Sequence, residues 1–230
     1  MSKAGTRSVI RRGISSGYRR QRRQTIKKID YKRELRELYA PRGEPAIVDV
    51  PDLTYLMIDG HGDPNTAPEF SEAIEALYTV AYTAKFAVKR APEGIDYGVM
   101  PLEGLFWTPD MSTFTTEDKS AWDWTMMIMQ PDLLTPEVFA QAQATAKKKK
   151  SLDAIGRMRL EHFAEGLAAQ VLHIGPYAAE GPTIQRLHAF IAEQGYERAG
   201  KHHEVYLGDP RRAAPEKMKT IVRQPIAAAS

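Results

Sequence analysis

The sequence predicts an α+β fold, in which tandem β-α-β-β repeats form an antiparallel sheet with helices on one face and a central ligand cleft. The first observation is the order of segments, because strand-like and helix-like patterns follow each other in the same order at about 45–135 and 165–226. The second is a repeated motif, since "MIMQP" at 127–131 parallels "IVRQP" at 221–225. Two such units side by side give a sheet covered by helices. We infer an internal duplication.

A third observation is an acidic residue in each half. "LEGLFW" parallels "HEVYLG", which aligns Glu103 with Glu204. The segment "HHEVYL" at 202–207 has the β-branched and aromatic residues of a strand. Glutamate is depleted from strands, and a buried carboxylate needs a partner. Two glutamates at matching positions therefore indicate a site at the seam between the repeats, where ligand sites often lie.

The first half begins with a short charged helix and a strand. The helix, "YKRELRELYA", ends at Pro41, and "LTYLMID" at 53–59 alternates like a strand. Thr66 and Glu69 form a capping box that predicts the start of a longer helix. The apolar stripe of that helix consists of Phe70, Ile74, Leu77 and Ala81.

The remaining segments complete the two repeats. Extended segments at 97–107 and 122–131 are separated by a polar loop, and a second helix begins at Thr135. It ends in four lysines at 147–150, whose charge suits a helix C-terminus. The second half repeats the order strand, helix, strand and strand, at 167–177, 181–195, 202–207 and 218–226.

The composition predicts one large domain behind a basic leader. The chain has 230 residues, 43% of them hydrophobic, which is enough for a substantial core. Residues 1–29 hold ten Lys or Arg and no acid, whereas 30–230 hold 22 basic and 29 acidic residues. The leader is predicted to be disordered. Alternatively, it contacts nucleic acid non-specifically or an anionic surface, serves as an organelle transit peptide, or is translated sequence upstream of the true start.

The absence of certain sequence features excludes several protein classes. No apolar run approaches the roughly 20 residues of a membrane-spanning helix, so no membrane association is expected. The chain has no cysteine, which fits a reducing compartment, and we expect a cytoplasmic protein. A metal site at 202–204 is not expected, because neighbours in a strand point to opposite faces. Metalloprotease, phosphate-loop and serine-hydrolase motifs are also missing.

Strand alternation defines the candidate site. Glu103 and Trp107 share one face of their strand, and Glu204 and Tyr206 share one face of theirs. If a twofold axis relates the repeats, these faces line the same cleft from opposite sides. A carboxylate among aromatic rings offers stacking, cation–π attraction and a base whose pKa rises on desolvation. The sequence thus predicts a small-molecule pocket.

The tryptophans and the glutamates also have simpler interpretations. All three tryptophans fall within 107–124, and Trp122 and Trp124 lie on the strand neighbouring "LEGLFW". A tryptophan at strand spacing commonly packs in a core, and an isolated strand glutamate commonly faces solvent. The repeat favours the pocket over these interpretations, because it places two glutamates with flanking rings at matching positions.

The motifs "LEGLFW", "MIMQP", "VLHIGPY", "HHEVYLGDPRR" and "KTIVRQP" together resemble the GyrI-like small-molecule-binding family, in its stand-alone branch. The resemblance runs from about Lys28 to Ile226. It implies a central cleft for bulky aromatic or cationic small molecules, with Glu204 at its centre. Related domains sense drugs in transcription regulators or protect DNA gyrase. Some stand-alone members hydrolyse the cyclopropane of DNA-alkylating cyclopropanoid antibiotics and so confer resistance.

This resemblance implies a mechanism without a metal or an organic cofactor. Glu204 is the expected general base that deprotonates a water, and Tyr206 or Tyr177 is the expected donor to the carbonyl oxygen where charge develops. Trp107 and Trp124 are expected to stack the flat ring system. The predicted ligand-binding residues are Glu103, Trp107, Trp122 and Trp124.

Two other functions remain open from the sequence. The same pocket could sequester a toxin or sense a metabolite without chemistry, because rings and a carboxylate serve both tasks. A gyrase-protective protein that docks on its target would instead need a large exposed apolar patch outside the cleft. No helix-turn-helix region is recognisable, which argues against direct transcriptional regulation.

Overall fold

The computed structural model describes residues 26–41, 43–92, 94–114, 118–208 and 213–229. Most of the predicted leader, 1–29, therefore lies outside the described residues. Its last three residues, Lys27–Ile29, form strand β1, which pairs in parallel with β3 (Ile95–Tyr97).

Six strands form a closed antiparallel ring in the order β6-β2-β5-β4-β8-β9, and β9 pairs back onto β6. Their bounds are β2 (Ala46–His61), β4 (Leu102–Trp107), β5 (Asp123–Gln130), β6 (Arg159–Ile174), β8 (His202–Tyr206) and β9 (Lys219–Ala228). The short strand β7 (Tyr196–Arg198) pairs with the outer end of β9. Closing the ring leaves these six strands with few unpaired edges.

The ring contains the β-α-β-β order twice, as the sequence predicts. The first unit is β2-α3-β4-β5, with α3 at Pro68–Arg90, and the second is β6-α6-β8-β9, with α6 at Gly181–Glu193. In each unit the last strand lies between the other two, and the units join through β2–β6 and β4–β8. The α+β class with tandem repeats is confirmed.

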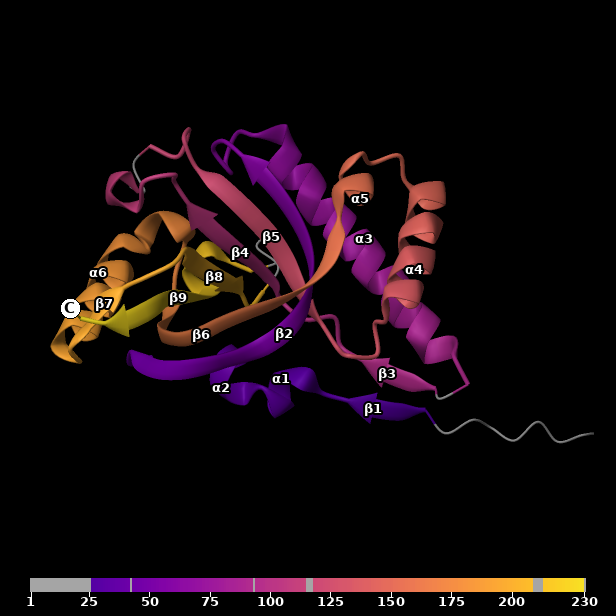
Figure 1. Ribbon diagram of the computed structural model, residues 1–230, viewed down its shortest axis with the longest axis horizontal. Coiled ribbons are helices and arrows are strands. Elements are labelled where there is room, and N and C mark those ends of the chain that lie inside the picture. The colour runs from indigo at the N-terminus through magenta and orange to yellow at the C-terminus, as the bar shows by residue number, and fades with distance from the viewer. Residues whose placement is uncertain (1–25, 42, 93, 115–117, 209–212, 230) are drawn as a thin grey trace, which may run out of the picture.

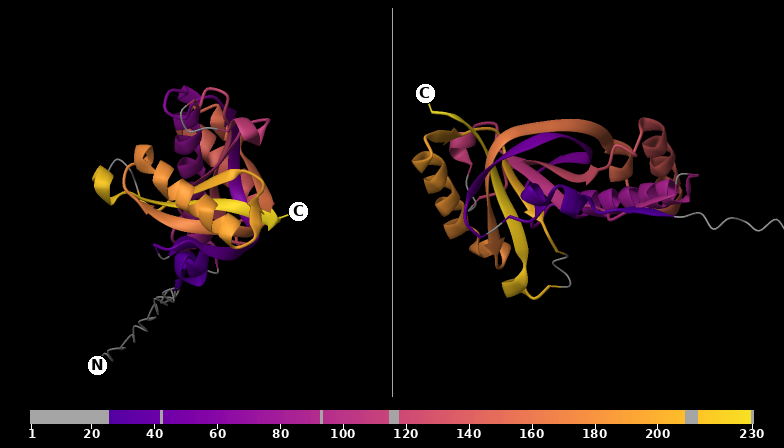
Figure 2. Two further views of the ribbon diagram at one scale, coloured as in Figure 1. Left: turned by 90° about the vertical axis from the view of Figure 1, so that its left-hand side faces the viewer. Right: turned by 90° about the horizontal axis from the view of Figure 1, so that it is seen from below.

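The helices pack on the same face of the sheet. Phe70 of α3 packs edge-on against Trp124 of β5, with ring centroids 5.1 Å apart. Leu187 and Ile191 of α6 pack against Val222 of β9 and its neighbours in a second core cluster. The two helices lie at different ends of the molecule, with α4 (Pro136–Lys149) and α5 (Ala154–Arg157) beside α3 (Figures 1 and 2). Apolar side chains of each helix thus bury one half of the sheet.

The N-terminal helices lie near β2, away from α3 and α6 (Figure 1). They are α1 (Tyr31–Glu34) and α2 (Arg36–Tyr39), and they are single turns joined at Leu35. Leu38 and Tyr39 of α2 are buried. This short segment therefore contributes to the core rather than acting as a linker.

Several element boundaries differ from the sequence prediction. Strand β2 has 16 residues, because its first part pairs with β6 and its second part with β5. The predicted strand at 53–59 covers only the middle of β2. The predicted capping box of Thr66 and Glu69 is wrong. Helix α3 begins at Pro68 after Ala67, and no side chain caps it. Thr135 does cap α4, by accepting a hydrogen bond from the backbone N–H of Val138.

Candidate functional site

The register of β4 and β8 places the two glutamates on opposite faces of the sheet. Glu103 pairs with Val205, and Glu204 pairs with Gly104. Directly paired residues share a face and successive residues alternate, so the two carboxylates point in opposite directions. The prediction that Glu103 and Glu204 line one hollow is therefore wrong. We call their surroundings the inner-face cluster (around Glu103) and the helix-face cluster (around Glu204).

A one-residue error in the alignment of the repeats explains this. Glu103 pairs with Met127, the first residue of "MIMQP", whereas the first residue of "IVRQP", Ile221, pairs with Val205. Glu103 is therefore equivalent to Val205 in the second repeat, not to Glu204. A shift of one residue moves a side chain to the other face of a strand.

The inner-face cluster fixes Glu103 completely. Glu103 is 0% exposed and accepts hydrogen bonds from Tyr39 Oη at 2.7 Å and from His203 Nε2 at 3.0 Å. The other ring nitrogen of His203, Nδ1, lies 2.9 Å from Oε1 of Glu165. Ionised carboxylates only accept, so both nitrogens donate and His203 is an imidazolium. Burial lowers the pKa of His203, but the carboxylates of Glu165 and Glu103 raise it more, and the pKa lies above its ordinary value.

A guanidinium completes this cluster. Arg223 donates to Glu165 Oε2 at 3.2 Å, to Gln170 Oε1 at 3.0 and 3.1 Å, and to the carbonyl oxygen of Leu38 at 3.0 Å. Burial raises the pKa of Glu165, but His203 and Arg223 lower it by more than burial raises it, so the net shift is downward. Two carboxylates thus balance two cations with their hydrogen bonds satisfied, which is the condition for burying charge. The inner-face cluster joins α2 to the ring.

The helix-face cluster brings together the three predicted catalytic residues. Glu204 lies 3.0 Å from His202 Nε2 through one carboxylate oxygen and accepts from Tyr206 Oη at 2.8 Å through the other. The ring of Tyr177, in the short 3-10 helix Tyr177–Ala179, packs edge-on against Tyr206 with centroids 5.4 Å apart. Tyr177 is 38% exposed, so this cluster reaches the surface through its phenol.

A second carboxyl group lies beside Glu204. Glu180, immediately before α6, is 4% exposed, and its Oε1 has no hydrogen-bond partner in the structure. Burial and the neighbouring Glu204 carboxylate raise the pKa of Glu180 to about 9. Burial raises the pKa of Glu204 as well, but the hydrogen bonds from His202 and Tyr206 and the charge of Lys119 lower it by more. The pKa of Glu204 therefore lies below its ordinary value. The pair therefore holds one proton near neutral pH, on Glu180.

Aromatic side chains border the helix-face cluster. Phe114 stacks on Trp122 with centroids 4.6 Å apart, and it lies 5.8 Å from the ring of His202. The ammonium of Lys119 lies 4.7 Å from the Trp122 ring centroid. Trp122 is thus connected to Glu204 through Phe114 and His202.

The other two tryptophans lie elsewhere, contrary to the prediction. Trp124 is 0% exposed beneath α3, and a Cβ built on Gly60 would lie only 2.1 Å from its ring, so it fills the core. Trp107 shares the inner face with Glu103, and the Lys201 ammonium lies 3.3 Å from its ring centroid. Neither indole can contact a ligand bound at Glu204. Strand alternation correctly placed Trp107 on the same face as Glu103, but that face is opposite to the one that carries Glu204.

Several residues of these clusters were missed from the sequence. In the helix-face cluster they are Glu180, His202, Phe114 and Lys119, and in the inner-face cluster they are Tyr39, Glu165, His203 and Arg223. Glu180 directly precedes the Gly-Pro start of α6 but does not cap that helix, so a capping pattern could not have pointed to it. The inner-face residues come from four separate elements and leave no local signal.

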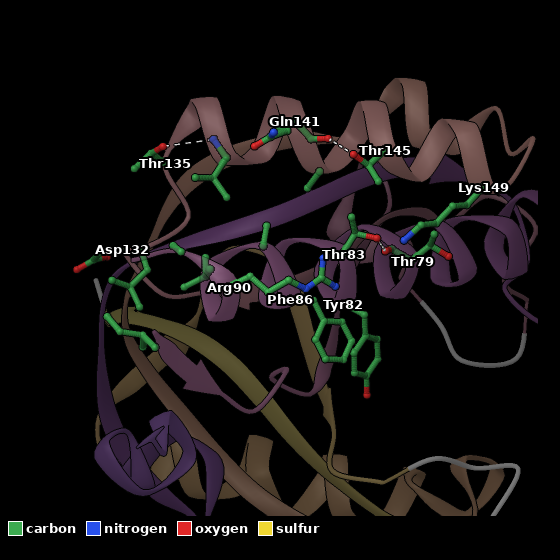
Figure 3. Close-up of a pocket in the computed structure, with 17 residues that line it drawn as sticks. Thr79, Tyr82, Thr83, Phe86, Arg90, Asp132, Thr135, Gln141, Thr145 and Lys149 are labelled. Carbon is green, nitrogen blue, oxygen red and sulfur yellow. Dashed lines mark hydrogen bonds between the residues drawn. The ribbon is translucent and has the colours of Figure 1, made fainter. Parts of the chain in front are cut away.

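A separate groove of about 950 Å³ lies between α3 and α4. Figure 3 shows Tyr82 and Phe86 side by side on α3, and Lys149 reaching from α4 toward Thr83. Tyr82 and Phe86 are 48% and 43% exposed. A smaller pocket of about 140 Å³ includes Tyr177 and so adjoins the helix-face cluster.

The part of the chain that the structure describes holds no group of three or more histidine or acidic side chains placed to bind a metal. None of the helices in that part is both long enough and apolar enough to cross a bilayer.

Comparison with known families identifies the fold. Residues 43–226 match the model of the GyrI-like small molecule binding domain. The chain belongs to the GyrI-like family. The GyrI-like domain binds small molecules, and the match covers both repeats and every residue of the helix-face cluster.

Solved structures agree with this membership. An uncharacterised conserved protein from Listeria innocua is 40% identical, with a TM-score of 0.80 over 86% of this chain and 100% of the other. Two structures described as hydrolases from Listeria innocua are 40% and 38% identical, with TM-scores of 0.78 and 0.76. They cover 87% and 86% of this chain and all of their own. The EcmrR C-terminal domain, 13% identical with a TM-score of 0.50, shares the fold alone. No curated protein matches the chain.

Proposed function

We propose that this GyrI-like protein hydrolyses the cyclopropane of DNA-alkylating cyclopropanoid compounds at the helix-face cluster, and so gives resistance to them. The observation that carries the proposal is the state of Glu204. It is a partly buried, ionised carboxylate, oriented by His202 and Tyr206 and bordered by aromatic rings. Because it is ionised, Glu204 can accept a proton from a water. Its lowered pKa corrects the expectation of a raised pKa, so positioning of the water, rather than high basicity, has to supply its effect as a base. The hydrolase description of two similar structures supports the reaction class.

The reaction adds one water across one carbon–carbon bond. Glu204 takes a proton from the water as its oxygen bonds to the cyclopropane methylene. The bond between that methylene and the spiro carbon breaks, and its electron pair moves through the conjugated dienone to the carbonyl oxygen. The resulting phenolate accepts a proton, and Glu204 later returns its own to solvent. Release of ring strain and formation of an aromatic ring drive this direction.

The remaining roles follow from the contacts. Tyr206 donates a hydrogen bond from its hydroxyl group to Glu204, and this contact holds the base in place. Tyr177, which is partly exposed, is the hydrogen-bond donor to the carbonyl oxygen. Trp122 and Phe114 provide the stacking surface that Trp107 and Trp124 were expected to provide. The inner-face Glu103 takes no part.

The variant Glu204→Gln tests the base. Gln keeps the shape of the side chain but cannot accept a proton, so turnover of a cyclopropanoid should fall about 10²–10⁴-fold with binding retained. Mass spectrometry of the water adduct gives turnover, and a fluorescence titration gives binding. Glu193→Gln, on the exposed end of α6, is the matched control and should behave as wild type. Unchanged hydrolysis by Glu204→Gln would end the proposal.

Binding without chemistry is the alternative at the same site. A sequestering protein would protect DNA stoichiometrically and yield no water adduct, and the same assay measures both. The groove between α3 and α4 favours a further candidate, docking on gyrase, because exposed Tyr82 and Phe86 form an apolar patch outside the site. In that case Phe86→Glu should abolish gyrase binding and leave cyclopropanoid turnover unchanged.

A further inference from the structure

The groove between α3 and α4 offers two exposed aromatic rings to a ligand. Its volume of about 950 Å³ lies in the range of small-molecule pockets. Tyr82 and Phe86 stand four residues apart on α3, so both rings face the same side of the helix. Both are exposed, and Figure 3 shows them side by side along one wall of the groove. A flat aromatic ligand in the groove can therefore stack on both rings.

Neighbouring side chains fix this aromatic wall before a ligand arrives. Tyr82 stacks on Tyr78, with ring centroids 6.3 Å apart. The Lys85 ammonium and the Arg90 guanidinium lie 5.8 and 5.9 Å from the centroid of the Phe86 ring. Rings that are already ordered lose little conformational entropy on binding, so more of the stacking energy contributes to affinity.

Two cationic side chains line the groove without an acidic partner among the residues that the structure describes. They are Arg90 of α3 and Lys149 of α4, one from each wall. Lys85 and Lys89 differ from them, because both pair with Asp96, at 3.4 and 2.7 Å. Figure 3 shows the Arg90 side chain lying along α3 and Lys149 reaching across from α4. An anionic group between the two walls would compensate both charges.

The acidic residue in the described lining, Asp132, lies away from Lys149. It precedes the first turn of α4, whereas Lys149 ends that helix, and the 14 helical residues separate them by roughly 20 Å. Figure 3 shows Asp132 and Lys149 at opposite ends of the groove. The cationic part is thus a local feature of a body, 30–230, in which 29 acidic residues outnumber 22 basic ones. This local positive charge favours an anionic ligand over a cationic one.

We propose that the groove between α3 and α4 is a binding site for an aromatic anion, a flat ring system that carries a sulfonate, carboxylate or phosphate group. The ring system stacks on Tyr82 and Phe86, and the anionic group lies between Arg90 and Lys149. This site is separate from the helix-face cluster, and it selects for the opposite charge to the one that a carboxylate attracts. The inference depends neither on hydrolysis nor on docking on gyrase.

Fluorescence titration with two probes tests this site. Anilinonaphthalene sulfonate is an aromatic anion whose emission rises on an apolar surface, and N-phenylnaphthylamine is the same ring system without the sulfonate. Lys149→Gln and Arg90→Gln should each weaken binding of the anionic probe about threefold to fivefold and leave binding of the neutral probe unchanged. Phe86→Ala should weaken binding of both probes about threefold to tenfold, because it removes a stacking ring.

Lys148→Gln is the matched control, since Lys148 is an exposed neighbour of Lys149 that does not line the groove. It should bind both probes as wild type does. Absence of binding of the anionic probe, an unchanged affinity of Lys149→Gln, or an equal loss in Lys148→Gln would each overturn the proposal. Sedimentation velocity should give the same mass with and without the anionic probe. A dimer that the probe dissociates would assign the groove to a second copy of the chain and would also overturn the proposal.

Discussion

The two faces of the β4–β8 pair carry acidic clusters with opposite properties. On the inner face, Glu103 and Glu165 meet an imidazolium and a guanidinium, and their carboxylates are fully engaged in hydrogen bonds. On the helix face, Glu204 is hydrogen-bonded to His202 and Tyr206, and burial together with the Glu204 carboxylate raises the pKa of the neighbouring Glu180 to about 9. The first arrangement is balanced in the absence of any ligand. The second holds a proton on Glu180 near neutral pH.

This difference separates a glutamate whose charge the chain itself compensates, Glu103, from the glutamate that we propose to be functional, Glu204. Glu103 is fully buried and Glu204 is partly buried. The distinction lies in whether partners from the chain satisfy the charge. Functional sites commonly retain strained or perturbed groups that the rest of the fold must stabilise. The experiments below test that distinction.

The largest expected effect comes from two adjacent histidines. His203→Leu removes the imidazolium between Glu103 and Glu165, and it should lower the free energy of unfolding by about 3–5 kcal/mol. His202→Leu, one residue away on the other face, removes one hydrogen bond from Glu204 and should cost about 1–3 kcal/mol. Urea unfolding measures both. Equal losses would contradict the assignment of the inner-face cluster as the structural one.

Glu180→Gln should raise the free energy of unfolding rather than lower it, because the wild-type side chain destabilises the fold as pH rises. The unfolded chain loses the Glu180 proton near pH 4.5, while the folded protein keeps it to a pKa of about 9. Between these values stability falls with pH, by up to about 1.4 kcal/mol per unit. The variant should therefore be up to about 3.5 kcal/mol more stable than wild type at pH 7 and equal to it at pH 4.

A residual pH dependence should survive in that variant. The pKa of His203 is raised above 6.5, so its stabilising contribution is complete below pH 6.5 and is lost as pH rises through the raised value. Thermal unfolding of Glu180→Gln across pH 5–9 should still show this decline. A flat profile would mean that His203 does not carry the charge its two carboxylate partners imply.

The smallest effects distinguish two tryptophans. Trp122→Leu should weaken binding of ethidium, an aromatic cation that serves as a fluorescent probe of the site, by about 0.5–1.5 kcal/mol, because it removes a stacking ring beside the helix-face cluster. Trp107→Leu should leave ethidium affinity unchanged, since that indole lies on the inner face against Lys201. Fluorescence titration gives both affinities. A larger loss for Trp107→Leu would place the ligand on the inner face.

Local sequence patterns predicted the elements well where a single face is buried. The α3 stripe, the strand at 202–207 and the order of both repeats all follow from side-chain periodicity, which is a property of a few consecutive residues. Strand alternation also placed Tyr206 with Glu204. The chain thus determined by itself its class, its repeats and the core of its catalytic candidates.

Only the tertiary structure decided which residues complete each cluster. Glu103 was assigned to the wrong site because the repeats were aligned one residue out of register, and register depends on pairing between distant strands. Glu180 reaches Glu204 only because α6 packs on the face that β8 presents to it. The partners that compensate a carboxylate come from distant parts of the chain. Sequence spacing could therefore identify the acidic residues, but not which of them are paired with cationic side chains in the folded protein.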